Sequence, residues 1–473
     1  MKTKKDKLSR QIQKPHHSLS EELESNELII DLKSYVNDLN SNNDVHYFNV
    51  QVMHNRRSID KQAVELAKNL IIEEPPFFDT PEPLPKTSAS SESGKIEILL
   101  GVAFDKLLES IDFLRIEEVE VYDESILNSC FSISSKYRTI SKLHLIDCCL
   151  NAKSIGIIAK QLRAENNTIK DLSLDMNVVP EQNYHCLIDG TTLEHISLKN
   201  CKINCKGAKL ISQALEYNKP ENKQNLLSLV LNGNAIEDCG LLFIAMALRT
   251  NFKLHYLSLA NNLITDSGIE MIAGILKNFP ISPEEDRRRR FMFIKYLESA
   301  TNQYGKECID PICNTVERFS VSNQQRKSSL SNDRPSTRTS NDETRNPEDI
   351  ISNISNSILS ATNIINGDLH PLLTTVYKDG NLKYCVGNFA LAYLNLSYNY
   401  FGKIGMHALI EAAKYQSSVG SQVNGLGLMG VKAEGLKRKE NVDEEIEELN
   451  KILRNRSLPK LYDRRHLISY ITL

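Results

Sequence analysis

The sequence predicts a mixed α/β solenoid in which short parallel strands alternate with helices. Two observations carry this prediction: one leucine pattern returns along the chain, and a helix-like apolar stretch follows nearly every copy. The pattern is L-x-x-L-x-L-x-x-N/C-x-I/L, and its clearest copy runs from Leu226 to Ile236. Alternating leucines fit one buried face of a strand, and the stretch after the turn fits a returning helix. We therefore expect parallel strands on a concave face and helices on a convex face.

Further copies begin at Leu193, Leu254 and Leu391, and two weaker copies begin at Ile140 and Ile169. A buried Asn or Cys at the turn position can satisfy backbone groups that the turn leaves unpaired, so these residues are predicted to be structural. They are Cys148, Asn177, Cys201, Asn234, Asn262 and Asn399. Degenerate copies flank the series, with Ile116, Val119 and Val121 before it and Val423, Leu426 and Leu428 after it.

The spacing of the turn residues sets the domain organisation. Asn262 and Asn399 are 137 positions apart, so an insertion of about 110 residues remains once one normal repeat is subtracted. We expect a mostly disordered N-terminal tail with a short helix and a Pro-rich linker (1–90), an N-terminal cap (91–135) and repeats (136–278). The insertion (279–389), C-terminal repeats (390–435) and a C-terminal helix and tail (436–473) follow.

The insertion has three expected parts. A helix begins at Ser282, with Pro283 at its first position and Glu285 completing a capping box. Residues 321–349 are almost free of apolar side chains and are expected to be a disordered linker. A hairpin with Asp379-Gly380 as its turn then returns the chain to the repeats. The Arg287–Arg290 run is better explained as a solvated first turn of the helix than as a phosphate site.

Composition excludes several classes of protein. With 57 basic and 60 acidic residues the formal net charge is −3, which argues against a generally basic nucleic-acid binder. Apolar runs are too short for a membrane span, and the polar N-terminus is not a secretory signal. The ten cysteines are widely spread, so we expect reduced thiols and a cytoplasmic protein.

No arrangement of residues typical of catalysis is evident. Phosphate-binding, nucleophile-elbow, zinc-protease and dinucleotide-binding patterns are all missing from the sequence. Cys308-I-D-P-I-Cys313 resembles half of a metal site, but no second pair follows. We therefore predict no enzyme activity, no cofactor, no metal and no small-molecule substrate.

A protein partner is the better prediction, and the strand face is the candidate surface. Its outward side chains are small and nearly neutral, with Tyr256 and Tyr393 as candidate anchors. The candidate protein-binding residues are His144, Ser173, His195, Ser197, Val230, Tyr256, Ser258, Tyr393 and Asn395. A solvated face without a partner remains an equal alternative.

The convex side carries apolar residues where solvent-facing ones are expected. Leu242, Phe243 and Met246 form this strip on one helix, and Leu210, Met271 and Ile275 extend it onto the neighbouring helices. We expect the insertion helix to cover the strip through Phe291 and Ile294. A partner surface is the second explanation.

Two resemblances follow from these residues. The repeat of about 28 residues with a full helix resembles the ribonuclease-inhibitor type of leucine-rich repeat, which implies a leucine-rich repeat solenoid shaped as a horseshoe. The text SLDMN-VVPEQNYH, HISLKNCKINCKGAKLISQAL and LSLANNLITDSGIEMIAGIL resembles the leucine-rich repeat-containing protein 71 family. That resemblance implies a non-enzymatic repeat protein, with no site residues to carry over, in motile cilia or flagella.

The function expected from these lines is a protein-binding scaffold or adaptor, with a ciliary or flagellar axoneme as the setting that the resemblance implies. Two alternatives stay open. One is a regulator of a small GTPase or another enzyme through the concave face, although the known solenoids of that kind are long and uninterrupted. The other is an actin-binding repeat module, because some actin-capping proteins carry a similarly short repeat domain.

Overall fold

The computed structural model describes residues 27–41, 46–53, 96–105, 110–117, 124–216, 225–304, 373, 376–379, 382–419, 425–438 and 440–463. They fall into two compact units, each treated separately here. The first unit covers the chain up to Ile203 and the segment Asn225–Asn234. The second unit covers Asn204–Gln224 and Ala235–Arg465.

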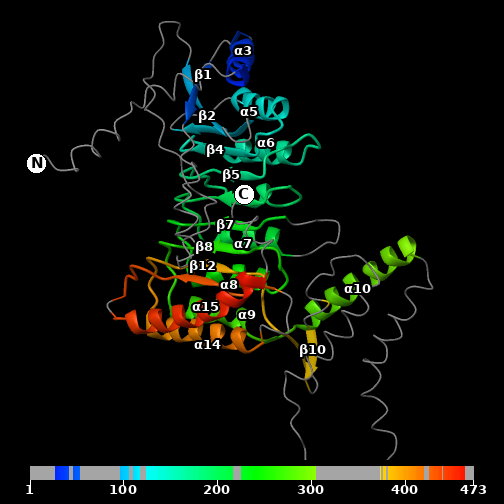
Figure 1. Ribbon diagram of the computed structural model, residues 1–473, viewed down its shortest axis with the longest axis vertical. Helices are drawn as coiled ribbons and strands as arrows, with labels where there is room; N and C mark the ends of the chain where they lie inside the picture. Colours follow the sequence, from blue (N-terminus) through cyan, green and yellow to red (C-terminus); the bar gives the residue numbers. More distant parts are fainter. Residues whose placement is uncertain are drawn as a thin grey trace, which may run out of the picture. The chain divides into compact units, whose positions relative to one another are not determined.

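The first unit is a row of strands with helices packed along it (Figure 1). Its strands are β1 (His46–Met53), β2 (Ile96–Asp105), β3 (Ser110–Glu117), β4 (Lys142–Ile146), β5 (Asp171–Ser173), β6 (His195–Ser197) and β7 (Ser228–Val230), adjacent in that order. All neighbours run parallel except β2 and β3, which are antiparallel. The helices are α3 (Glu27–Ser41), α5 (Glu124–Lys136), α6 (Ala152–Leu162) and the 3-10 helix η2 (Asn183–Leu187).

The leucine pattern places one buried row through the centre of this sheet. Leu114, Leu143, Leu172, Ile196 and Leu229 stand at the same register position on β3 to β7. Each is at most 1% exposed, so the row forms a continuous apolar core. Burying each such side chain contributes on the order of 2 kcal/mol. The parallel strands and their leucine core confirm the predicted solenoid.

Strand β1 extends the sheet beyond the expected cap. No strand was predicted for residues 46–53, yet all eight of them pair with β2 in parallel register. Within the predicted cap, 91–135, the structure places β2, β3 and nearly all of α5.

Both predicted edge copies were wrong in register. Leu114 and Ile116 pair with Leu143 and Leu145, so the first pattern is Ile111-x-x-Leu114-x-Ile116 and not Ile116, Val119 and Val121. After the last full copy, Val431 pairs with Leu394, so that pattern is Leu428-x-x-Val431-x-Ala433 and not Val423, Leu426 and Leu428. Both errors are five residues, because apolar residues at the edges repeat densely enough to fit the pattern twice.

The turn asparagines tie neighbouring repeats together through their side-chain amides. Asn177 is fully buried, and its Oδ1 accepts hydrogen bonds from the backbone N–H groups of Cys148 (2.8 Å) and Leu150 (3.2 Å). Its Nδ2 donates to the carbonyl oxygens of Leu145 (2.7 Å) and Leu174 (3.1 Å). One amide thus satisfies four backbone groups in two repeats, none of which could reach water.

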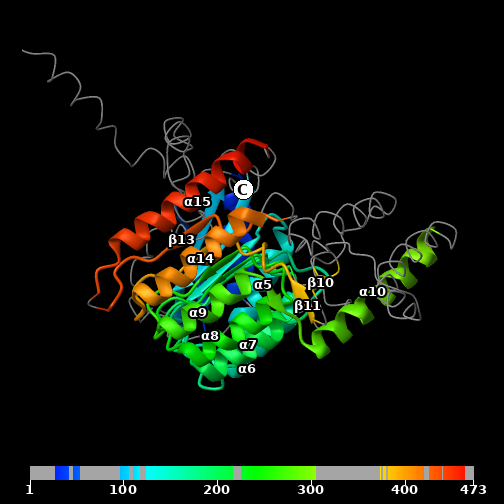
Figure 2. The ribbon, with the colours of Figure 1, turned by 90° about the horizontal axis from the view of Figure 1, so that it is seen from below.

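The second unit stacks its helices in one row. These are α7 (Cys205–Leu215), α8 (Asp238–Leu248), α9 (Asp266–Leu276), α14 (Lys403–Val419) and α15 (Asp443–Asp463), each packed on the next (Figure 2). The strands β8 (Tyr256–Ser258), β12 (Tyr393–Asn395) and β13 (Gly430–Lys432) are parallel neighbours. Glycine allows close packing between the helices: a Cβ on Gly240 would lie 3.2 Å from the Cβ of Ala208.

The insertion leaves and re-enters this unit at one small antiparallel sheet. Its strands are β9 (Phe279–Pro280), β10 (Val376–Asp379) and β11 (Leu382–Cys385), in the order β10-β11-β9. The hairpin is confirmed, although Asp379 pairs with Leu382 and so ends the ladder instead of opening the turn. The next strand, β12, pairs with β8 in register, Leu394 opposite Leu257.

Helix α10 (Pro283–Tyr304) begins as the sequence predicts. The backbone N–H of Glu285 donates to Ser282 Oγ (3.1 Å), and the N–H of Ser282 donates to Glu285 Oε2 (2.6 Å). This reciprocal pair is the predicted capping box.

A disulfide joins Cys205 to Cys239, with the two Cα atoms 6.1 Å apart. The prediction that all thiols are reduced was therefore wrong for this pair. The two cysteines are 34 positions apart in sequence, and only the stacking of α7 on α8 brings them together. Cys148 and Cys201, the two turn cysteines, are buried and lie outside the disulfide, and burial raises the pKa of the Cys201 thiol to about 12.

Several predicted features lie outside the described residues. They are the N-terminal basic tail, the Pro-rich linker near Pro75–Pro85, the linker 321–349 and the Cys308–Cys313 pair. No helix among the described residues is both long and apolar enough to cross a membrane.

Replacing Asn177 with Ala is expected to leave the Cys148 and Leu150 amides without an acceptor and to destabilise the surrounding repeats by about 3 kcal/mol. Hydrogen exchange on the full chain should show protection lost at those two amides. Asn166→Ala is the matched control, because its side chain is exposed and, within the part of the chain that the structure describes, donates to Ser135 Oγ alone. Unchanged protection in Asn177→Ala would contradict the bridging role.

Candidate interaction surfaces

The predicted strand-face residues line up in rows, but the structure buries most of them. In the first unit, His144, Ser173, Ser197 and Val230 share one register position on β4 to β7. None is more than 6% exposed, whereas His195 on the neighbouring row is partly exposed. In the second unit, Ser258 and Asn395 are buried partners. The strand face as defined from the sequence therefore offers little solvent-accessible side chain.

In the first unit, some of these buried strand-face side chains make polar contacts inside the protein. Asp175 Oδ1 accepts hydrogen bonds from Ser197 Oγ (2.5 Å) and from the Lys199 backbone N–H (2.9 Å). His144 stacks edge-on against Phe113 with ring centroids 4.5 Å apart, and its Nε2 lies 3.8 Å from Asp171 Oδ1. Burial lowers the pKa of His195, although the nearby Asp171 partly opposes this shift.

In the second unit the two proposed tyrosine anchors differ. Tyr256 is only 6% exposed, whereas its register partner Tyr393 keeps an intermediate exposure. Burial raises the pKa of the Tyr393 phenol. Of the two predicted anchors, Tyr393 is the one that retains contact with solvent.

Exposed side chains concentrate instead at the ends of the strands. In every full repeat the residue before the turn Asn or Cys has a left-handed backbone, and in two repeats this residue is bulky: Met176 (φ 64°) and Tyr398 (φ 60°). They are 48% and 51% exposed. Large side chains rarely adopt this conformation, whereas Asn and Gly, found at Asn200, Gly233 and Asn261, do so readily.

We call Leu263, Tyr398 and Tyr400 of the second unit the rim residues. Their exposures are 40%, 51% and 40%. The Lys437 ammonium lies 4.9 Å from the Tyr400 ring centroid, and its Nζ also donates to Asn261 Oδ1 (2.8 Å). The Tyr398 ring packs against Gly435, where an added Cβ would lie 2.3 Å from Cε1. The rim is therefore an exposed aromatic surface held in a fixed arrangement. Sequence reasoning missed it because its positions are x in the repeat pattern.

The convex strip is partly open. Leu242 and Met246 on α8 are 38% and 55% exposed, Phe243 is half-buried, and Ile275 on α9 is buried. The prediction that Phe291 and Ile294 cover this strip was wrong, because these side chains are themselves 54% and 51% exposed. The helix carrying them is held by charged groups near its start and not by these apolar residues.

The match to known proteins agrees with the register of the strands. Residues 222–245 and 250–273 match the family model described as "Leucine Rich repeat". The repeats are leucine-rich repeats.

The leucine-rich repeats also match longer proteins. Ribonuclease inhibitor of Sus scrofa is 27% identical over 160 residues, 33% of this chain and 34% of that protein. NACHT, LRR and PYD domains-containing protein 5 of Homo sapiens is 23% identical over 193 residues, 35% of this chain and 16% of that protein. The chain thus spans about a third or less of these relatives. An internalin from Listeria monocytogenes matches with a TM-score of 0.30 and 12% identity, over 74% of this chain and 70% of the internalin.

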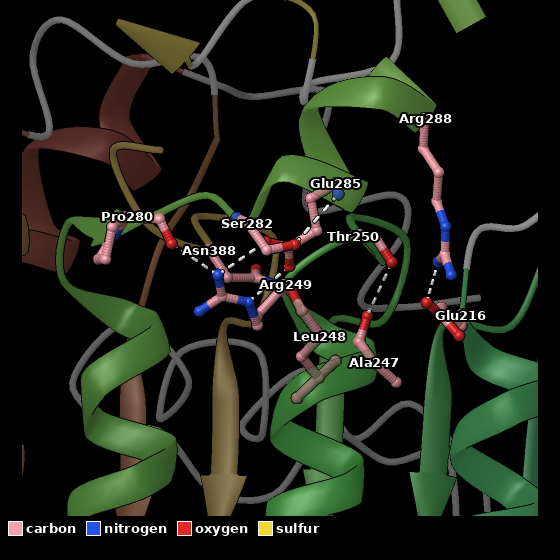
Figure 3. A network of polar contacts seen from close by, with 10 residues as sticks. All are labelled: Glu216, Ala247, Leu248, Arg249, Thr250, Pro280, Ser282, Glu285, Arg288 and Asn388. Carbon is pink, nitrogen blue, oxygen red and sulfur yellow. Dashed lines mark hydrogen bonds and ion pairs between the residues drawn. The ribbon is translucent and has the colours of Figure 1, made fainter. Parts of the chain in front are cut away.

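A polar network joins the insertion helix to the leucine-rich repeats of the second unit (Figure 3). The Arg249 guanidinium, at the end of α8, makes two contacts with Glu285, Nε to Oε1 (2.6 Å) and Nη2 to Oε2 (2.9 Å). Its Nη2 also donates to the Pro280 carbonyl (2.7 Å), and its plane lies 4.2 Å from the Phe279 ring centroid. A bidentate pair of this kind fixes the direction of the helix as well as its position.

The arginine run takes part in this attachment. Arg288 pairs with Glu216 and with Glu284, the latter at 3.1 Å. Arg289 and Arg290 both pair with Asp286, which Lys383 of β11 also contacts at 2.7 Å. The prediction of a solvated first turn is therefore too simple, because acidic groups of the same chain engage three of the four arginines.

Asn388 anchors the chain where it returns from the insertion. Its Nδ2 donates to the carbonyl oxygens of Leu248 (2.7 Å) and Asn251 (2.9 Å), at the end of α8. Its Oδ1 accepts from the backbone N–H groups of Ala390 (2.9 Å) and Leu391 (3.0 Å). This buried amide therefore joins the last turn of one leucine-rich repeat to the start of a later one; of the residues in these contacts, Figure 3 draws Asn388 and Leu248.

The carboxyl groups of this attachment have lowered pKa values. Burial alone would raise the pKa of Glu285, but the hydrogen bonds from Arg249 and Ser282 outweigh it. For Asp286, burial is likewise outweighed by the hydrogen bond from Lys383 and the charge of Arg289. Both groups are therefore stabilised as carboxylates by their cationic neighbours.

Arg249→Ala should weaken the attachment of α10 by about 2 kcal/mol, because it removes a charge-assisted bidentate pair. Hydrogen exchange of residues 283–292 should become faster, while the core of α8 stays protected. Arg290→Ala is the control, since the Arg290 side chain is 65% exposed and, among the described residues, pairs with Asp286 alone. Equal hydrogen-exchange rates for residues 283–292 in both variants would contradict the role of Arg249 in attaching α10.

Acidification should loosen the same attachment. A carboxyl with a lowered folded-state pKa contributes stability above its ordinary pKa, here 4.5 for Glu285 and 3.8 for Asp286, and loses it as the pH falls through the folded value. Proteolysis within α10 should therefore accelerate between about pH 5 and pH 3. In Glu285→Gln the acceleration should be smaller, because the carboxylate is absent at every pH. A cleavage rate that does not change with pH would show that the Glu285 and Asp286 carboxylates do not hold α10 in place.

Proposed function

We propose that this protein is a non-enzymatic protein-binding module, a scaffold or adaptor, built on leucine-rich repeats. The observation that carries the proposal is the rim: Tyr398 and Tyr400 are exposed, ordered against Gly435 and Lys437, and Tyr398 has a left-handed backbone that a tyrosine seldom adopts. Exposed tyrosines with fixed side chains are typical anchors of protein interfaces.

The rim belongs to the same repeat as the candidate anchor Tyr393. Strand β12 ends at Asn395, and the loop that follows it carries Tyr398 and Tyr400. We propose that a partner contacts this loop and the accessible edge of Tyr393 together. The buried members of the predicted strand face, such as Ser258 and Asn395, would then support the surface instead of touching the partner.

The cellular setting proposed here is a cilium or flagellum. Its support is the sequence resemblance given above, in particular the Pro180–His185 stretch, PEQNYH, which does not belong to the generic repeat. A protein that holds neighbours in an axoneme needs surfaces for protein partners and no active site, which agrees with the exposed aromatic rim.

A second candidate function is regulation of an enzyme. The name of the pig relative, ribonuclease inhibitor, supports it, since that relative matches over the repeats. Against it stands the burial of the concave-face residues, because an enzyme bound on that face would meet few accessible side chains. The rim therefore remains the preferred surface.

Tyr398→Asn is expected to abolish partner binding while keeping the repeat folded. Asn200 and Asn261 occupy the equivalent position of other repeats, and Asn tolerates a positive φ better than Tyr. Proximity labelling in ciliated cells should show axonemal neighbours for the wild-type chain and fewer of them for Tyr398→Asn. Circular dichroism should be the same for both proteins.

Gln213→Glu, at an exposed site on α7, is the matched control and should label the same neighbours as wild type. An unchanged set of neighbours in Tyr398→Asn would refute the rim as the binding surface. A diffuse set without axonemal proteins would remove the ciliary setting. Enzyme neighbours, a GTPase effect or actin co-sedimentation would instead favour the alternatives.

A further inference from the structure

A pair of cysteines and a glutamate meet where two neighbouring helices begin. Cys205 is the first residue of α7, and Cys239 is the second residue of α8. Glu237 is the N-cap of α8, but its side chain makes no capping hydrogen bond. Both sulfur atoms and one carboxylate oxygen of Glu237 lie within 4.8 Å of one another.

Two thiols and a carboxylate are a ligand set that suits zinc. Thiolate and carboxylate ligands bind Zn²⁺ at about 2.3 Å and about 2.1 Å, usually in a tetrahedron. Among the residues that the structure describes, this is the one group of three His, Cys, Asp or Glu side chains close enough to share an ion. Water could fill the fourth position, because Glu237 and Cys239 are exposed.

The local backbone favours the charged form of both thiols. Each cysteine lies in the first turn of its helix, where the helix dipole stabilises a negative charge. Thiolate is the form that binds metal. The neighbouring Asp238 is already engaged, since its carboxylate accepts from the Thr265 backbone N–H (2.8 Å) and from Thr265 Oγ1 (2.5 Å). Glu237 is therefore the carboxylate left to complete the group.

Close helix packing fixes the spacing of the two cysteines. A Cβ on Gly240 would lie 3.4 Å from the Cα of Cys205, so the absence of a side chain lets the two helix starts approach. With Cα atoms 6.1 Å apart, rotation about the side-chain bonds is enough to separate the sulfurs to about 3.8 Å, the distance across a tetrahedral zinc site.

We propose that Cys205, Cys239 and Glu237 form a zinc-binding site when the disulfide is reduced. The reductant is a small thiol of the glutathione class: two such thiols are oxidised to their disulfide while Cys205 and Cys239 become thiols. Binding of Zn²⁺ then releases the two thiol protons and joins α7 to α8 through the metal instead of through the sulfur–sulfur bond. Glu237 forms a backbone bridge with the rim residue Leu263, but the three proposed ligands are not rim residues, and the proposal does not depend on the proposed function.

The test uses the full chain, freed of metal and kept under a non-chelating phosphine reductant. Co²⁺ is the first probe, because thiolate ligands give an intense sulfur-to-metal charge-transfer band, and Zn²⁺ should displace it. The wild-type chain should show this band, Cys205→Ser/Cys239→Ser should lose it, and Glu237→Gln should bind Zn²⁺ about tenfold more weakly or worse. Oxidation of the wild-type chain should release the metal.

Cys308→Ser/Cys313→Ser is the essential control, because that pair resembles half of a metal site in the sequence. It should keep the band, as should Cys149→Ser, which replaces an exposed cysteine outside the disulfide. A band that persists in Cys205→Ser/Cys239→Ser, or a reduced wild-type chain that binds no metal, would overturn the proposal. Circular dichroism of each variant shows whether a lost band results from unfolding. Because Glu237→Gln retains both thiols, its affinity for Zn²⁺ tests the role of the carboxylate separately.

Discussion

A short strand that ends in a sharp turn leaves several backbone N–H and C=O groups facing the interior, where water cannot reach them. In the repeats with a turn asparagine, one side-chain amide solves this problem, and it does so across the boundary between two repeats. Asn399 shows the pattern in the second unit: its Oδ1 accepts from the N–H groups of Asn262 (3.1 Å) and Ile264 (3.2 Å), and its Nδ2 donates to Leu259 O (2.9 Å). The parallel strands, the leucine row and the stacked helices all depend on neighbouring turns being bound to one another.

The cysteines at the same position satisfy the turn less completely. Cys201 Sγ contacts the carbonyl oxygens of Leu174 (3.2 Å) and Lys199 (3.4 Å), and a thiol can neither donate twice nor accept strongly. At the boundary before Cys201 the Tyr184 hydroxyl supplies the missing acceptor, since it receives the N–H of Val179 (2.9 Å). A cysteine is therefore tolerated where another side chain accepts a bridging hydrogen bond in place of the asparagine.

The sequence was sufficient for features that depend on local chemistry. The leucine periodicity, the capping box of Ser282 and Glu285 and the hairpin at the end of the insertion are each set by residues close together in the chain. The sequence was insufficient where several registers bury similar apolar residues, as at Ile111–Ile116, and where groups far apart in sequence meet, as in the Arg249–Glu285 pair.

The exposure of the candidate surface also depends on residues far apart in the sequence. Periodicity tells which side of a strand a residue such as Ser197 faces, but not that this side is buried, and it gives no weight to Tyr398 at an unconstrained position of the pattern.

The small sheet at the base of the insertion has a further consequence for how the chain can vary. Phe279 pairs with Cys385 and Pro280 with Tyr384, so antiparallel strand pairing holds the two ends of the inserted segment side by side before the repeats resume. After this small sheet, Asp266 Oδ1 accepts hydrogen bonds from the N–H groups of Gly402 and Gly405, both at 2.8 Å, and so holds the start of α14 in place. The entropic cost of closing a loop grows only slowly with its length. Residues can therefore be gained or lost between these anchor points with little penalty to the solenoid, which leaves this segment free to diverge while the repeats on either side keep their register.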